Sequence, residues 1–138
     1  MLTNKAKYGL KALVHLARLG DGRLAPISDI AATNTIPKKF LDAILLELRK
    51  AGFVRSKMGP GGGYGLERPG ADIIVGDIIR TLDGPLAPIA CASRVAYRSC
   101  DDCDVATCPV RLSMLRVRDA MAAILDTMTL ADMLTVSD

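Results

Sequence analysis

Four cysteines lie close together in the second half of the chain, at Cys91, Cys100, Cys103 and Cys108, with the spacing Cys-x8-Cys-x2-Cys-x4-Cys. Thiolates bind soft metal ions and iron–sulfur clusters, and they also form disulfides. In a reducing compartment, clustered cysteines are more often metal ligands or redox groups than structural disulfides. The segment therefore predicts a metal centre or a thiol switch.

Three interpretations of the cysteine segment stay open from the residues alone. Four thiolates are enough for an iron–sulfur cluster, either [2Fe–2S] or [4Fe–4S]. Zinc is the second candidate, although sulfur-only zinc sites usually have two Cys-x2-Cys pairs and this chain has one, at Cys100 and Cys103. The third is a metal-free redox switch, in which the thiols form disulfides.

Two predicted helices flank the cysteine segment. The first is short, covers residues 73–82 and ends at Gly84, and the second is long and covers residues 110–127. The long helix is apolar on more than one side and so needs two partners, of which one is its own domain and the other is expected to be a second copy of the chain. Residues 85–108 are predicted to form an irregular loop, and a short helix is expected near 129–134.

The N-terminal half has the pattern of three helices and a hairpin. Helices are predicted over residues 4–19 and 27–33. A third helix, with the clearest helical pattern of the chain, follows in "PKKFLDAILLELRKAG". Strands at 53–57 and 64–68, joined by "MGPGGG", predict a hairpin. This order is typical of a winged helix-turn-helix, whose second helix enters the DNA major groove. The apolar face of that helix is expected to hold Phe40, Leu41, Ile44, Leu45 and Leu48.

Polar side chains occur where such a fold meets DNA. Lys38 and Lys39 begin the stronger helix and can reach phosphates or guanine edges, and Asp42 can accept a hydrogen bond from a cytosine amino group. Arg55 and Lys57 add charge on the first strand of the hairpin, and the glycine tip lets backbone N–H groups approach phosphates. A hairpin without a ligand and a nucleotide-binding loop are the alternatives, but no Gly-Lys-Ser/Thr follows the glycines.

The charges are divided unevenly along the chain. Residues 1–68 contain 12 Lys or Arg and 5 Asp or Glu, whereas residues 69–138 contain 6 and 10. A basic first half favours contact with a polyanion, although such charges also solvate an ordinary surface. Aromatic residues make up only 4% of the chain, which argues against binding of RNA or single strands by stacking. No transmembrane run or secretory signal is found, so we expect a cytoplasmic protein.

One long stretch of sequence resembles a known family. The segment "LRKAGFVRSKMGPGGGYGL", preceded by "ISDIA" and followed by "IIVGDIIRTLDG", is similar to the IscR-type (IscR/NsrR/RirA-like) iron–sulfur transcriptional regulators, and the resemblance covers residues 1–134. It implies a homodimeric bacterial regulator with an N-terminal winged helix and a long C-terminal dimerisation helix. It further implies binding to palindromic promoter DNA and a cysteine loop that often holds a [2Fe–2S] or [4Fe–4S] cluster.

The resemblance also implies individual site residues. The DNA-contacting positions that it carries over to this chain are Thr3, Lys5, Lys38, Lys39, Asp42, Arg55, Lys57, Gly61 and Gly62. Many relatives have Arg where this chain has Met58, so Lys57 is expected to take over part of that role. Cys91 and Cys108 match the outer cluster ligands, Cys100 or Cys103 matches the middle one, and the additional thiol completes a set of four. The chain has no His after Cys108, where some relatives supply a ligand, and its one His, His15, is expected to be a structural or surface residue.

These observations combine into one prediction. The fold is mainly α, a winged helix-turn-helix with a two-stranded wing and a long C-terminal dimerisation helix, divided into residues 1–84, 85–109 and 110–138. The function is a homodimeric promoter-binding regulator, in its simplest form a repressor, switched by a cluster that responds to iron, redox state or nitric oxide. A metal-free, zinc or thiol-switched regulator is the alternative. A small iron–sulfur carrier or thiol oxidoreductase is disfavoured, because no βαβ pattern and no catalytic constellation accompany the cysteines.

Overall fold

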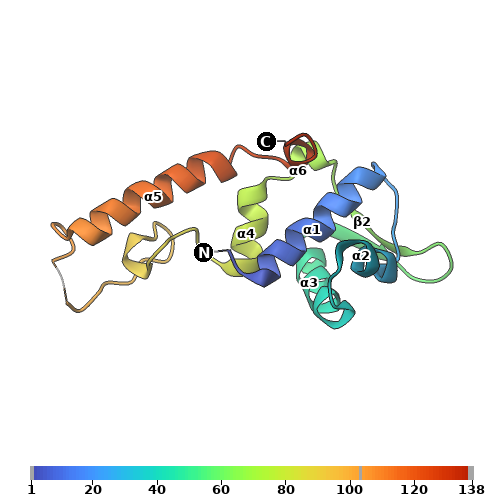
Figure 1. Ribbon diagram of the computed structural model, residues 1–138, viewed down its shortest axis with the longest axis horizontal. Helices are drawn as coiled ribbons and strands as arrows, with labels where there is room; N and C mark the ends of the chain where they lie inside the picture. Colours follow the sequence, from blue (N-terminus) through green and yellow to red (C-terminus); the bar gives the residue numbers. More distant parts are fainter. Residues whose placement is uncertain (1, 103, 137–138) are drawn as a thin grey trace.

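The computed structural model describes residues 2–102 and 104–136 and is mainly helical (Figure 1). Its helices are α1 (Asn4–Leu19), α2 (Ile27–Asn34), α3 (Lys38–Lys50), α4 (Val75–Asp83), α5 (Pro109–Leu125) and α6 (Leu130–Met133). Its strands are β1 (Val54–Lys57) and β2 (Gly63–Leu66), and its 3-10 turns are η1 (Gly70–Asp72) and η2 (Ala90–Ala92). The predicted helices and strands are confirmed, with ends that differ by at most two residues.

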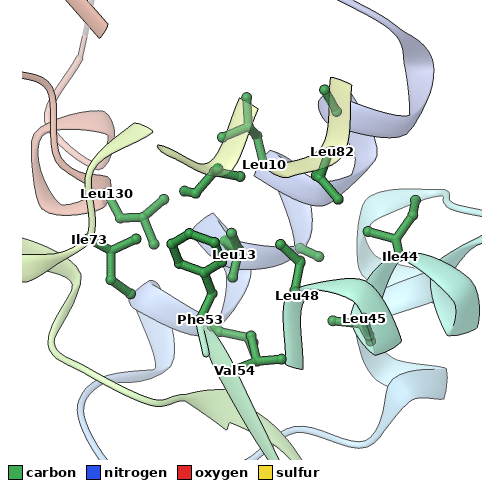
Figure 2. Close-up of a cluster of buried hydrophobic side chains, with 14 of the residues drawn as sticks. Leu10, Leu13, Ile44, Leu45, Leu48, Phe53, Val54, Ile73, Leu82 and Leu130 are labelled. Atoms are coloured by element: carbon green, nitrogen blue, oxygen red, sulfur yellow. The ribbon is translucent and has the colours of Figure 1, made fainter. Parts of the chain in front are cut away.

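A single apolar core lies between α1, α3 and α4 (Figure 2). Leu13 of α1 and Leu45 and Leu48 of α3 are fully buried in it, next to Phe53 at the entry to β1. Burial of such side chains contributes about 1.5–3 kcal/mol each before conformational entropy is subtracted. The core therefore fixes α3 against α1 and α4. These helices, together with α2 and the hairpin, are called the N-terminal body below.

The end of the chain returns to this core. Leu130 of α6 is fully buried beside Ile73 (Figure 2), and its N–H donates to the carbonyl of Ile73 at 3.0 Å. The N–H of Val75 donates to Met128 at 2.8 Å, so the chain passes back over the start of α4. The division at residue 110 stays a prediction, but α6 packs on α1 and η1 of the N-terminal body.

Helix α5 extends away from that body, and the cysteine loop lies beside its N-terminal half (Figure 1). Ala122 is the one buried residue among those of α5. Val110, Val117 and Ile124 are 62%, 43% and 60% exposed, so much of the apolar arc of this helix is uncovered in a single chain. None of the helices among the described residues is long and apolar enough to cross a membrane.

The hairpin forms the predicted wing, and two of its glycines, Gly62 and Gly63, are required by close backbone contacts inside the protein. Strands β1 and β2 are antiparallel with Val54 opposite Leu66 and Lys57 opposite Gly63. β2 also pairs with Ala25, since Tyr64 and Ala25 exchange two backbone hydrogen bonds of 2.8 Å. A Cβ atom at Gly63 would collide with the carbonyl of Ala25, and one at Gly62 would collide with the carbonyl of Lys57.

Phe40 was expected on the buried face of α3, and this expectation is wrong. Its side chain is 62% exposed, whereas Leu41, Ile44, Leu45 and Leu48 are all buried. Successive residues of a helix are rotated by about 100°. Phe40 therefore projects to one side of the buried stripe, in the first turn of α3.

We expect Gly63→Ala to lower the free energy of unfolding by roughly 1–3 kcal/mol, because the new methyl group must displace the strand at Ala25 and adopt a positive φ. The control is Gly61→Ala, which also has a positive φ (74°) but has no atom within 4 Å of the new methyl group. Denaturant unfolding followed by circular dichroism measures both. Equal losses for the two variants would contradict the steric explanation.

Candidate nucleic-acid interface and cysteine loop

The first turn of α3 presents an exposed, basic surface. Lys38, Lys39 and Asp42 are all exposed, as the sequence predicted, and Pro37 precedes the helix in an extended conformation. Among the described residues, no carboxylate lies within ion-pair distance of Lys38 or Lys39. Both ammonium groups are therefore available to an anionic ligand.

Thr3 links the beginning of the chain to the end of α4. Its hydroxyl caps α1 by accepting from the N–H of Ala6 at 3.2 Å. Its own N–H donates to the Asp83 carboxylate at 3.0 Å, and its hydroxyl donates to the other oxygen of the same group. Asp83 is the last residue of α4, and the segment that leads to the cysteines begins at the next residue. Sequence reasoning missed this contact, which joins positions 80 residues apart.

Lys5 is held against α3. Its ammonium donates to Glu47 at 2.7 Å, and both side chains are about 43% exposed. Exposed ion pairs contribute little to stability, at most about 1 kcal/mol. The pair instead places Lys5 beside the helix whose first turn carries Lys38 and Lys39.

The predicted residues of the wing are divided between two environments. Arg55 donates to the carbonyl of Gly22 at 3.1 Å, so it fastens β1 to the turn after α1. Lys57 and Gly61 are exposed toward the tip, and Gly62 is half-buried. The structure thus brings Lys5 to α3, Thr3 to α4 and Arg55 to the turn after α1.

Cys91 and Cys108 lie at the two ends of one loop. Cys91 is buried in η2, Cys108 is half-buried at the N-cap of α5, and these two are the free thiols among the described residues. Cys100 is half-buried, and Cys103 lies outside the described residues. Within residues 2–102 and 104–136, no three Cys, His, Asp or Glu side chains are gathered as a metal site requires. His15 of α1 contacts the amide of Asn34 at 3.1 Å, as expected for a structural residue.

One side chain of α5 binds both limbs of this loop. The Nε of Arg111 donates to the carbonyl of Cys91 at 2.9 Å, and a terminal nitrogen donates to the carbonyl of Val105 at 3.1 Å. The guanidinium also lies over the ring of Tyr97, 5.7 Å from its centre. Arg111 was not singled out from the sequence. Its position one helical turn after Cys108 was the available signal.

An ion pair adds a second attachment of the loop to α5. Arg94 donates twice to the carboxylate of Asp119, at 2.8 and 2.6 Å. The hydrogen bond from Arg94, with a smaller contribution from Arg118, lowers the pKa of Asp119 to about 2. Because this pKa is lower than that of an unfolded Asp, the attachment contributes above about pH 4 and is lost as the pH falls through about 2.

The other end of α5 is fixed to α4. Arg80 donates to both oxygens of Asp126, at 2.6 and 2.9 Å. This hydrogen bonding raises the pKa of Arg80 and lowers that of Asp126. Gly76 lies so close to Asp126 that a Cβ atom would collide with the carboxylate. Helix α5 is therefore held at its C-terminal end by α4 and along its N-terminal half by the cysteine loop.

A mainly apolar groove of about 580 Å³ separates the N-terminal body from α5. Its walls come from the N-terminus, α4, the segment after α4 and α5, represented by Leu2, Ile79, Leu86, Val117 and Met121. Thr3 and Asp83 both line it. The groove thus borders the contact that joins the beginning of α1 to the cysteine segment.

Comparison with known proteins decides the family. The sequence profile of the Rrf2 family, described as iron-dependent transcriptional regulators, matches residues 2–136. This chain belongs to the Rrf2 family. It is 43% identical to an rrf2-like HTH-type transcriptional regulator of Rhodobacter capsulatus, over 100% of this chain and 95% of that protein. The resemblance stated from the sequence is thereby confirmed, and so is the predicted class of protein, a transcriptional regulator.

Solved structures of Rrf2-family regulators show the same fold. CymR, the global cysteine regulator of B. subtilis, superposes with a TM-score of 0.82 at 33% identity, covering 100% of this chain and 98% of that one. IscR of T. potens superposes with a TM-score of 0.76 at 30% identity, covering 100% and 93%. The winged-helix fold class with a long C-terminal helix is confirmed. The Rrf2 chain is therefore a DNA-binding transcriptional regulator.

We expect Arg111→Gln to loosen the cysteine loop without unfolding the body, because two backbone carbonyls lose their donor. Limited trypsin digestion should cleave after Arg94 and Arg98 several-fold faster than in the wild type. The matched control is Arg116→Gln, which removes an exposed arginine from the same helix. Equal cleavage rates in all three proteins would show that Arg111 does not hold the loop.

Proposed function

We propose that this Rrf2-family chain is a homodimeric regulator that binds duplex promoter DNA and whose affinity follows the state of the cysteine loop. The observation that carries the proposal is the basic first turn of α3, exposed and without acidic partners among the described residues, in a winged-helix family of transcriptional regulators. In such folds the N-terminal residues of this helix meet the base edges.

The proposed DNA contacts fall into two groups. One group contacts the edges of the bases, and the other contacts the DNA backbone and positions the protein. Lys38 and Lys39 bind phosphates or guanine edges, and Asp42 accepts from a cytosine amino group. The remaining contacts fix the register of the protein on the duplex, from the N-terminus and the wing. They are Thr3, Lys5, Arg55, Lys57, Gly61 and Gly62.

The dimer is proposed to form along α5. Val110, Val117 and Ile124 recur every seven residues and are exposed, which is the spacing of a coiled-coil seam. A two-fold pair of α5 helices would cover this seam and present two copies of α3. Two reading heads related by two-fold symmetry match a palindromic site.

The donor chemistry of the cysteine loop fits an iron–sulfur cluster. Cys91, Cys100, Cys103 and Cys108 supply four sulfur donors, and the N-terminal end of α5 at Cys108 favours a negatively charged group. The family description of iron dependence supports this cofactor. When bound, a cluster supplies a redox-sensitive and iron-sensitive group that ties the limbs of the loop together. The alternative is a metal-free or zinc-bound thiol switch, and the similarity to CymR, a cysteine regulator, supports it.

A chain of contacts leads from the loop to the proposed DNA surface. The segment after Asp83 runs to Cys91. We therefore expect a rearrangement of the cysteine loop to move the C-terminal end of α4. Asp83 holds the N-terminus of α1 through Thr3, and two residues later Lys5 is paired with Glu47 of α3. Ordering or loosening of the loop thus shifts Thr3 and Lys5 relative to α3.

We expect specific duplex binding that weakens steeply with salt, by about one unit of log–log slope per phosphate contact. Lys39→Ala should weaken binding to a promoter fragment, that is, duplex DNA from upstream of a gene, about tenfold. Lys50→Ala is the matched control, since Lys50 is exposed at the opposite end of α3. Fluorescence anisotropy over a salt series measures both. No preference of the wild type for any upstream fragment over random duplex would contradict the proposed function.

We also expect DNA affinity to differ between protein reconstituted anaerobically with iron and sulfide and metal-free protein, by roughly 5- to 150-fold. Asp83→Ala should shrink this ratio and leave the visible spectrum of the reconstituted protein unchanged, because it cuts the contact with Thr3 and not the cysteines. If the affinity ratio of Asp83→Ala equals that of the wild type, Asp83 does not transmit the change from the loop. If the reconstituted protein shows no visible absorption, the cluster is excluded and the thiol-switch alternative remains.

A further inference from the structure

Phe40 is a large apolar side chain on the basic first turn of α3, within the proposed DNA surface. It is 62% exposed in the first turn of α3, directly after Lys38 and Lys39. The core of the molecule does not use it, since α3 buries Leu41, Ile44, Leu45 and Leu48 instead. An exposed phenyl ring forgoes the burial energy that its neighbours gain. Its exposure leaves the ring available to a partner outside the chain.

The surroundings of Phe40 indicate what that partner is. Ala43 lies one turn further along the helix and is also exposed, so the two side chains form a small apolar patch. Lys39 lies four residues before Ala43 and so borders this patch, and an apolar protein surface would have to desolvate its ammonium group. A polyanion that also carries apolar groups satisfies both features.

Duplex DNA has such groups in its major groove. The C5-methyl of thymine is the apolar feature that distinguishes its edge, and Phe and Ala are suitable contacts for it. Lys39, beside this patch, is then placed to bind a neighbouring phosphate or guanine. We propose that Phe40 packs against a thymine methyl group in each half-site and so determines a thymine preference. This inference rests on the proposed function, that α3 enters the major groove.

The test uses a duplex selected by the wild-type protein from a random-sequence pool. Each thymine of a half-site is replaced singly by deoxyuridine, which removes the methyl and keeps the base pair. At one position the wild type should lose affinity by roughly three- to fivefold, the effect expected for one buried methyl group. Phe40→Ala should bind the thymine and uracil duplexes equally, at the weaker affinity.

A second variant on the same helix controls for general loss of binding. Leu46 is 45% exposed on α3 but lies beyond the first turn, so Leu46→Ala should keep the discrimination between thymine and uracil. Circular dichroism checks that both variants fold, and Phe40→Gln repeats the test with a polar side chain of similar reach.

The outcomes separate the inference from the function on which it rests. If the wild type selects a site but no uracil substitution weakens binding, or if Phe40→Ala still discriminates, the methyl contact is overturned and promoter binding stands. If the wild type selects no sequence from the pool, the proposed function fails and the role of Phe40 falls with it.

Discussion

Burial of one face of α3 determines what its other faces can do. Leu41, Ile44, Leu45 and Leu48 are packed into the core between α1 and α4, and the helical repeat then sets the direction of every other side chain on α3. Lys39 and Ala43 point away from the core because the leucines point into it. The basic first turn, the ion pair from Lys5 and the exposed ring of Phe40 all depend on this one packing arrangement.

The cysteine loop is held in a different way. Its attachments to α5 are polar, through Arg111 on two backbone carbonyls and through the Arg94–Asp119 pair, and residues 94–99 are exposed. A segment with few buried apolar contacts opens at a lower free energy than a core helix. Such a loop suits a sensing element, since a ligand or a disulfide can change its order without unfolding the body. In the proposed mechanism, the Thr3–Asp83 contact would carry that change to α1.

The glycine-rich wing has two separate physical explanations. Gly62 and Gly63 are required where the backbone of the hairpin touches Lys57 and Ala25, whatever binds to the wing. Gly61 meets no atom of the protein and has a positive φ, so it serves the turn at the tip. The conspicuous glycine motif is therefore explained first by the fold, and the proposed contact with the DNA backbone would be an additional use of the same small residues.

The sequence by itself determined the elements and the family. Helical periodicity, Pro37 and the glycine stops are local signals, so the bounds of α1, α3 and the hairpin could be read to within two residues. Only the tertiary structure decided that Phe40 is exposed, that Thr3 binds Asp83, that Arg111 binds the cysteine loop and that α6 returns to the core. The physical reason is that a periodic pattern indicates which side of a helix is buried, but how wide the buried stripe is, and so whether it includes Phe40, depends on what packs against the helix. Which face meets which partner depends on how segments far apart in the chain pack, and no local pattern encodes that.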